Sequence, residues 1–148
     1  MTQEVDALQS RIGYRIKEAQ VAIRVRMEEG LRPFDLSAAQ YAALELIDRT
    51  PRISNAQLAR DAFVTRQSMN TMIKSLERRG LITRATEAPS GRELPTTLTR
   101  RGTELLRAAA VTVSAMETQA VAHLSETQQR QLLSGLESVI TALRPPDA

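Results

Sequence analysis

The segment from Ser54 to Thr99 constrains the fold of this chain more than any other stretch, because it pairs two short helices with a basic hairpin. Residues 54–61 predict a short helix that begins at Ser54, and Val64-Thr65 ends it. Arg66 to Arg79 predicts a second, amphipathic helix, and Gly80 stops it. Two helices joined by a turn of this length indicate a helix-turn-helix unit.

A β-hairpin is predicted directly after the second helix. Residues 81–84 and 94–98 have strand character and flank a polar loop, and Pro95 suits only an edge strand or a local break. The tip of that loop contains Ser90, Gly91 and Arg92. A polar helix beside a basic hairpin fits the major groove and the adjacent backbone of duplex DNA.

The charge distribution favours a phosphate partner. Residues 51–101 contain ten basic and four acidic side chains, a net charge of +6, whereas the rest of the chain carries −3. A solvated basic surface is the alternative explanation. Aromatic residues make up only 3% of the chain and Trp is absent, so platforms for stacking single-stranded bases are scarce and duplex DNA is the better partner.

Several protein classes are excluded by composition. The chain has no cysteine, which excludes disulfides, Cys-based zinc fingers, iron–sulfur clusters and thiol redox sensing. Residues 1–6 lack the basic start and apolar core of a secretion signal, and no apolar run approaches the ~18 residues of a membrane span. A soluble, cytoplasmic protein without membrane contact is expected.

Long helices are predicted on both sides of the hairpin segment. The first covers about Gln3 to Gly30, and its narrow apolar stripe exceeds what a compact monomer can cover, so pairing with another chain is expected. Another long helix is predicted from Thr99 to about His123, after the hairpin, and a last one from Ser125 to Pro145-Pro146. Their apolar lines are Leu105, Ala109, Val113, Met116 and Ala120, and then Leu132, Leu136, Val139, Ile140 and Leu143.

Helix starts are marked by hydroxyl side chains. Capping boxes are predicted for Ser37 with Gln40, Ser54 with Gln57 and Ser125 with Gln128, and single caps at Thr65 and Thr99. Leu36 and Tyr41 are placed as a hydrophobic staple, and Ile53 can add a short strand beside the hairpin.

The helix over residues 66–79 has two different faces. Met69, Met72, Ile73 and Leu76 recur at helical spacing and predict the buried face. The opposite face carries hydrogen-bonding side chains of modest length, which suit base edges: Gln67, Ser68, Asn70, Thr71 and Lys74.

The order and spacing of these pieces resemble the MarR-type winged helix-turn-helix regulators over almost the whole chain. The pieces are Leu36-Ser37-x-x-Gln40-x-x-x-Leu44, Ile53-Ser54-x-x-x-Leu58-Ala59 with Val64-Thr65-x-x-Ser68, Leu76-Glu77-Arg78-Arg79-Gly80-Leu81-Ile82, and Leu98-Thr99-Arg100-Arg101-Gly102. The resemblance departs at Ser90, where the family usually has an acid that helps to hold the wing and its arginine, here Arg92.

This resemblance implies a mainly α single domain over 1–148, with at most a three-stranded small sheet. Residues 36–99 would form the winged helix-turn-helix region, and residues 1–35 and 100–148 the dimerisation helices. The implied function is a transcriptional regulator of the repressor type, bacterial or archaeal and associated with the nucleoid. As a homodimer it would place two recognition helices in successive major grooves ~34 Å apart on a pseudo-palindromic site. Interface residues would include Leu8, Ile12, Leu132, Leu136, Val139 and Leu143.

Residue roles follow from this interpretation. Gln67 and Asn70 can pair with adenine edges, and Lys74 can reach guanine or a phosphate, with Ser68 and Thr71 beside them. Arg66, Ser54, Asn55 and Arg84 are expected at phosphates, and Arg92, flanked by Ser90 and Gly91, at the minor groove or a phosphate. For Arg78, Arg79 and Arg84, solvated helix-end charge remains an alternative.

Family members often release DNA when a small aromatic or other anionic compound binds beside the dimerisation helices. Arg11, Arg15 and Tyr41 lie near such a crevice by rough alignment, although the two arginines can equally form interface salt bridges or remain solvated. Two further alternatives stay open: a winged helix that binds an acidic protein, and a DNA-binding regulator without a ligand.

No catalytic or metal-binding constellation is predicted. His123 is the single histidine and has no acid–base partner in the pattern, and the carboxylates lack ligand spacing. An enzyme, a cofactor and a metal are therefore not expected.

Overall fold

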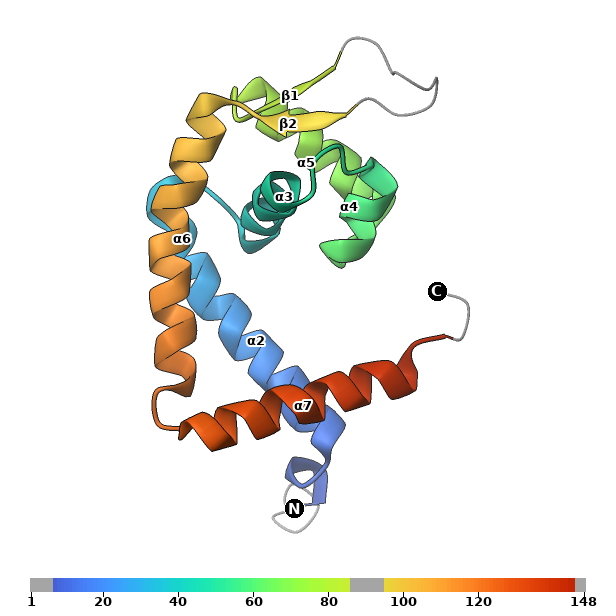
Figure 1. The fold of residues 1–148 in the computed structure, drawn as a ribbon, viewed down its shortest axis with the longest axis vertical. Helices are drawn as coiled ribbons and strands as arrows, with labels where there is room; N and C mark the ends of the chain where they lie inside the picture. The colour runs from blue at the N-terminus through green and yellow to red at the C-terminus, as the bar shows by residue number, and fades with distance from the viewer. Residues whose placement is uncertain (1–6, 86–94, 146–148) are drawn as a thin grey trace. The chain divides into compact units, whose positions relative to one another are not determined.

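The computed structural model describes residues 7–85 and 95–145 of the 148-residue chain. The described part is mainly helical with one small antiparallel sheet, in agreement with the predicted fold class. Contacts divide the chain into two compact units, Met1–Ser114 and Ala115–Ala148. No described helix has the length and apolar character that crossing a membrane requires. The elements are α2 (Ile12–Leu31), the 3-10 turn η1 (Arg32–Phe34), α3 (Ala38–Arg49), α4 (Asn55–Asp61), α5 (Arg66–Arg78), β1 (Ile82–Arg84), β2 (Thr96–Leu98), α6 (Arg100–Val121) and α7 (Glu126–Leu143) (Figure 1).

The first long helix is not continuous from Gln3, because the backbone leaves the helical path before α2. Residues 7–9 form a helical turn, but Arg11 is extended, with φ −78° and ψ 122°. The Ser10 hydroxyl donates to the Ala7 carbonyl at 2.9 Å within this turn. The prediction of one helix over residues 3–30 is therefore wrong at this break, and residues 3–6 lie outside the described part.

Four of the predicted helix caps are confirmed by their hydrogen bonds, including Thr99, whose hydroxyl accepts from the N–H of Gly102 at the start of α6. Ser37 and Ser125 each form a complete capping box with the glutamine three residues later. The Thr65 hydroxyl accepts from the backbone N–H of Ser68 at the start of α5. These starts were predictable because the partners are at most three residues apart.

Ser54 starts α4 as predicted, but without a capping box. Its hydroxyl accepts from the N–H of Gln57, while the Gln57 side chain bonds to Asp61 and Arg60 instead of returning to the cap. Ile53 is buried but belongs to no strand, since it closes a turn by donating to the Thr50 carbonyl. The sheet in the described part of the chain therefore has two strands.

Helix α5 ends where the sequence predicts, at a left-handed glycine. Gly80 has φ +70°, its N–H donates to Glu77, and the N–H of Leu81 donates to the Leu76 carbonyl. These two bonds form a Schellman motif, which terminates a helix cleanly. The chain then enters β1, which pairs antiparallel with β2 and places Ile82 opposite Leu98.

The core of the first unit lies among α3, α4, α5 and the sheet, and it receives one face of α6. Of the four predicted core residues of α5, three are fully buried and Met72 is half-buried. The fully buried large side chains are Leu31, Leu44, Leu58, Met69, Ile73, Leu76, Leu81, Ile82 and Thr96.

Helix α6 uses a slightly different buried line from the one predicted, and it ends at Val121 rather than His123. Gly102, Leu106, Ala109 and Val113 are buried at spacings of three and four. Leu105, Met116 and Ala120 fall outside this series: the first two are half-buried and Ala120 is exposed.

Helix α7 buries none of its residues within the chain, so its predicted buried side is wrong for the single chain. Leu132 is 47% exposed and Leu143 is 78% exposed. The helix is amphipathic nonetheless, and its apolar stripe has no covering partner in its own unit.

Candidate nucleic-acid interface

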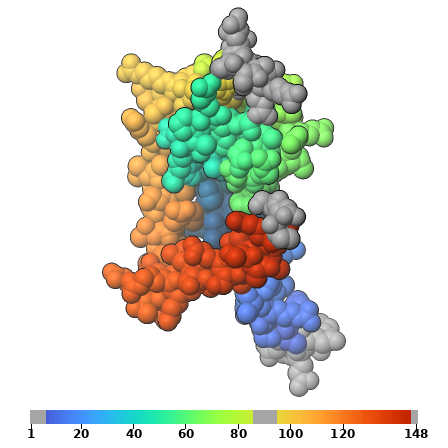
Figure 2. All heavy atoms as spheres, turned by 45° about the vertical axis from the view of Figure 1, so that its right-hand side comes forward, coloured from blue at the N-terminus to red at the C-terminus, as the bar shows by residue number. Residues whose placement is uncertain are grey.

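Helix α5 presents a polar face to solvent because three of its four apolar residues are buried in the core. Met69, Ile73 and Leu76 are completely buried. All six residues predicted to contact DNA from this helix are exposed: Arg66, Gln67, Ser68, Asn70, Thr71 and Lys74. In Figure 2 the atoms of α3, α4 and α5, coloured teal to green, form one continuous surface.

The exposed residues of α5 form a central strip along the helix with a flank on either side. At 3.6 residues per turn, Gln67, Thr71, Lys74 and Arg78 follow one another directly opposite the buried stripe. We call these four the reading strip. It contains two cations and no acid, and the single acid of α5, Glu77, lies on a flank.

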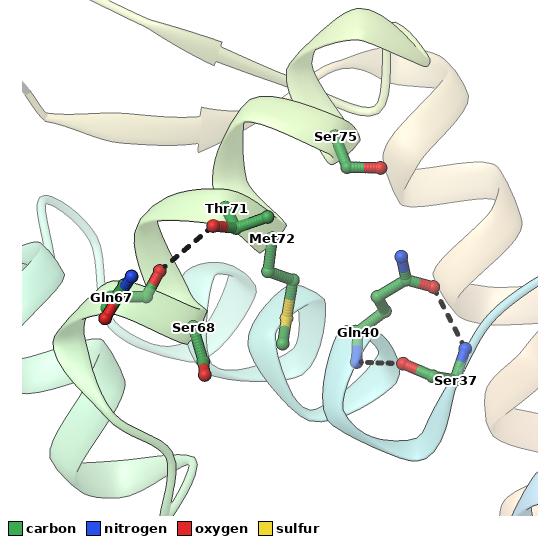
Figure 3. Close-up of a pocket in the computed structure, with 7 residues that line it drawn as sticks. All are labelled: Ser37, Gln40, Gln67, Ser68, Thr71, Met72 and Ser75. Atoms are coloured by element: carbon green, nitrogen blue, oxygen red, sulfur yellow. Dashed lines mark hydrogen bonds between the residues drawn. The ribbon is translucent and has the colours of Figure 1, made fainter.

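The two flanks of α5 meet different helices. On one flank, Asn70 faces α4, where the Nδ2 of Asn55 donates to the Oδ1 of Asn70 at 3.1 Å. On the other flank a surface groove of about 500 Å³ separates α5 from the start of α3 (Figure 3). None of the seven residues that line this groove is charged: Ser37, Gln40, Gln67, Ser68, Thr71, Met72 and Ser75.

Hydrogen bonds within the helix decide which groups remain available. The Thr71 hydroxyl donates to the Gln67 carbonyl at 3.1 Å, so its methyl group and its acceptor lone pairs are left for a partner (Figure 3). Ser68 shares a hydrogen bond with the Thr65 hydroxyl at 3.0 Å. Within the described residues, neither the Gln67 amide nor the Lys74 ammonium has a hydrogen-bond partner, and both can therefore bond an incoming base or phosphate.

The two neighbouring arginines at the end of α5 have different surroundings. Arg78 is exposed on the reading strip. Arg79 is only 27% exposed, and its guanidinium donates to the Asp35 carbonyl at 2.7 Å and to the Phe34 carbonyl at 3.5 Å. Arg79 therefore fastens α5 to the turn after α2, a role that the sequence did not reveal because its partners lie 44 and 45 residues away.

The residues predicted at the DNA backbone are not equally accessible. Ser54 and Asn55 are half-buried at the start of α4, and the Ser54 hydroxyl is engaged in capping. Arg84 lies at the base of the wing, opposite Thr96 in the strand pair. Within the described part, the Nε and Nη2 atoms of Arg84 are buried without hydrogen-bond partners, and the Oγ1 atom of Thr96 is too. A phosphate contact by Arg84 would thus use Nη1 or require the side chain to move. The wing-tip residues Ser90, Gly91 and Arg92 lie outside the described residues.

The three residues predicted at an effector crevice do not lie together within one chain. Tyr41 is buried in α3, near the C-terminal end of α2, since Glu28 accepts a hydrogen bond from the Ala38 N–H. Arg15 lies 13 residues before Glu28 along α2, a distance of ~20 Å. Arg15 pairs with Glu18 at 2.7 Å, and Arg11 is exposed.

The predicted interface residues are open in the single chain. Leu8 is 42% exposed and Ile12 is 71% exposed. Leu132 and Leu143 of α7 are exposed as well, and Leu136 and Val139 are half-buried. Of the 20 residues of α2, only Leu31 is buried, so both helices carry apolar side chains that their own units leave uncovered.

Titratable side chains do not gather into a metal or catalytic cluster in residues 7–85 and 95–145. No group of three His, Asp or Glu side chains there is close enough to hold a metal ion. His123 is exposed in the turn between α6 and α7.

The chain is similar in sequence to a known family of proteins. The family model described as "MarR family" matches residues 34–93. The HTH-type transcriptional repressor Rv2887 of Mycobacterium tuberculosis (strain ATCC 25618 / H37Rv) is 35% identical over 128 residues, which cover 86% of this chain and 92% of that protein.

Solved structures agree with this relationship. The crystal structure of Rv2887 from Mycobacterium tuberculosis in complex with salicylic acid is 35% identical, with a TM-score of 0.72, over 88% of this chain and 96% of that chain. The transcriptional repressor CouR, bound to a 23-mer DNA duplex, is 27% identical, with a TM-score of 0.81, over 89% and 94%. The resemblance seen in the sequence motifs is thereby confirmed, and the chain belongs to the MarR family of transcriptional regulators.

Proposed function

We propose that this protein is a sequence-specific double-stranded DNA-binding transcriptional repressor that acts as a homodimer on a pseudo-palindromic operator. The observation that carries the proposal is the reading strip: Gln67, Thr71, Lys74 and Arg78 stand in line on an exposed helix face, opposite a fully buried stripe. Amide, hydroxyl and cationic groups in this arrangement match base edges and phosphates of the major groove. Such a regulator acts on the chromosome and would reside in the bacterial or archaeal cytoplasm.

The relatives support this proposal through what their names state. Rv2887 is named a transcriptional repressor, and the solved structure of the transcriptional repressor CouR is bound to a DNA duplex. The backbone-contact roles of Arg66, Ser54 and Asn55 belong to the same proposal, as do those of Arg84 and the wing-tip Arg92. Their phosphate contacts would supply most of the salt-dependent affinity.

Dimerisation is proposed from the uncovered stripes of α2 and α7. Exposed apolar side chains at regular helical spacing favour a second copy of the chain as the covering partner, because a closed two-fold pair buries the same surface on both subunits. Two copies would present two α5 helices, which suits half-sites about one helical turn, ~34 Å, apart.

A small aromatic acid is proposed as the effector. The structure of Rv2887 with salicylic acid supports this class of compound. Arg11 and Arg15 of one subunit are cations that could pair with a carboxylate where two chains meet, while Tyr41 lies in the core beside the end of α2. Thiol oxidation is excluded as the release signal, since the chain has no cysteine.

The test is binding of the purified protein to a duplex that covers its own upstream region, beside a shuffled duplex, across a salt series. We expect tight, selective binding to the first duplex, with a steep dependence of log Kd on log salt. Salicylate is then titrated into the complex, and release of DNA is expected with a parallel rise in the thermal stability of the free protein. Equal, weak binding to both duplexes and to a genomic fragment library would contradict the proposal and favour a protein partner.

A further inference from the structure

The side-chain amides of Asn55 and Asn70 form the hydrogen bond that ties α4 to the exposed face of α5. Asn55 is the first residue of α4 and is half-buried, whereas Asn70 is exposed on the flank of α5. The Nδ2 of Asn55 donates to the Oδ1 of Asn70 over 3.1 Å. The two residues are 15 positions apart in the sequence, so the pair is a tertiary contact and not a local cap.

This bond gives the Asn70 amide a direction. A carboxamide presents an acceptor at one corner and two donor hydrogens at the other. When Oδ1 is held by Asn55, it is turned toward α4, and the NH₂ group is turned away from α4. A freely rotating amide would offer both corners equally to a base edge, but a tethered one offers mainly its donor.

Base edges in the major groove respond differently to a donor. Guanine N7 and O6, adenine N7 and thymine O4 accept hydrogen bonds there, whereas the cytosine N4 amino group only donates. A donor-presenting Asn70 is thus suited to guanine, adenine or thymine and is mismatched to cytosine.

We propose that Asn55 is a specificity-determining positioning residue, which holds the Asn70 amide so that its NH₂ group reads an acceptor on one base of the operator. This inference rests on the proposed function. It adds that Asn55 determines whether Asn70 donates or accepts a hydrogen bond at one base. Asn55 itself need not touch a base for this role, because it acts through Asn70.

The sharpest variant is Asn55→Asp. A carboxylate can only accept, so it can bond Asn70 only through the NH₂ group, and this reverses the Asn70 amide. The Oδ1 of Asn70 would then face the base. We expect the preferred base at one position of each half-site to change toward cytosine, or toward the N6 amino group of adenine, by about tenfold in relative affinity.

Two further variants distinguish a reversed Asn70 amide from one that has only lost its hydrogen bond to Asn55. Asn55→Ala leaves the Asn70 amide free to turn, so selectivity at the same position should weaken without reversing. Asn70→Ala should abolish selectivity there, and the double variant Asn55→Asp with Asn70→Ala should match Asn70→Ala, because Asn55 has nothing left to orient.

The matched control for the added charge is Ala56→Asp. This substitution places a carboxylate one residue later in the same first turn of α4. Asn55 is unchanged in this variant, so its hydrogen bond to Asn70 is kept. It should lower affinity for every duplex by a similar factor and leave base preference unchanged.

The readout is a selection on randomised half-site duplexes with each full-length variant, at one fixed salt concentration, after thermal melting has shown that each variant is folded. A reversed preference in Asn55→Asp that is absent from Ala56→Asp supports the proposal. If the wild type selects a sequence and Asn55→Asp selects the same one, the positioning role is overturned while the proposed function stands. If Asn70→Ala retains full selectivity at every position, the role is likewise overturned. A wild type that selects no sequence overturns the proposed function together with this inference.

Discussion

Phe63 occupies an unfavourable backbone conformation in the turn between α4 and α5. Its φ is +57°, and its N–H donates to Arg60 while that of Val64 donates to Ala59, which makes it the left-handed residue of a helix-ending motif. Glycine is the usual residue at this position, because a Cβ atom costs about 1 kcal/mol there. The ring is 94% exposed, so packing offsets none of this cost.

Phe63→Gly should therefore raise the free energy of unfolding by about 0.5–1 kcal/mol, after allowing for the greater freedom of glycine in the unfolded chain. Urea denaturation of the two proteins measures the difference. Phe63→Ala is the matched control, since it removes the ring and keeps the left-handed strain. If alanine stabilises as much as glycine does, the backbone explanation is wrong.

Gly102 is required by a close approach between α6 and the base of the wing. A Cβ atom at this position would lie 1.9 Å from the carbonyl oxygen of Leu81, a backbone atom that cannot rotate away. The same oxygen accepts the N–H of Thr99, whose hydroxyl in turn donates to Gly80 and accepts from Gly102. The end of α5, the first wing strand and the start of α6 are thus fixed at one point.

Gly102→Ala should lower the free energy of unfolding by about 2–3 kcal/mol, because the joint must open to admit a methyl group. Gly135→Ala in α7 is the comparison, since nothing lies within 4 Å of the Cβ it would add. That variant should gain up to ~1 kcal/mol from helix propensity. Thermal melts of both variants test the contrast, and equal effects at the two glycines would count against the close-approach argument.

At the scale of elements, the sequence predicted what local chemistry controls. Ser37, Thr65 and Ser125 cap helices as expected because the hydroxyl of an extended residue before a helix reaches the N–H three residues later. The prediction went wrong where a local competitor was stronger. The Gln57 amide bonds Asp61 and Arg60 in place of the cap.

The candidate site divides in the same way. Periodicity alone places Gln67 and Lys74 opposite Met69 and Ile73, so the exposed face of α5 was predictable. The hydrogen bond from Asn55 to Asn70 and the contact of Arg79 with Asp35 were not, because each joins elements whose relative placement only tertiary packing determines.

The adjacent arginines at the end of α5 provide a test at this scale. Arg78→Met should weaken DNA binding and reduce the salt slope by about one, while stability changes by less than ~0.5 kcal/mol. Arg79→Met should instead cost about 1–2 kcal/mol of stability, because it removes the bonds to the turn after α2. Salt-dependent anisotropy and urea denaturation of both variants separate the two roles. An unchanged stability in Arg79→Met, with a loss of salt slope, would make Arg79 a phosphate contact after all.

At the scale of the whole molecule, the apolar side chains of α7 lack a partner within their own unit. Leu132, Leu136, Val139 and Leu143 recur on one side of an amphipathic helix of which no residue is buried. A monomer would leave this stripe in water at a cost of roughly 25 cal/mol per Å². A second copy of the chain removes that cost, and it also doubles the number of reading strips.

Leu132→Glu tests this link between assembly and DNA binding, since it introduces a charge into the apolar stripe of α7. Sedimentation equilibrium should show a shift from dimer to monomer at micromolar concentration, and the affinity for the operator duplex should fall by about 100-fold because simultaneous binding to two half-sites is lost. Ser134→Glu adds the same charge on the opposite side of α7 and should leave both quantities unchanged. A Leu132→Glu protein that remains dimeric would place the interface elsewhere. One that is monomeric yet keeps its affinity would mean that a single winged helix is sufficient for recognition.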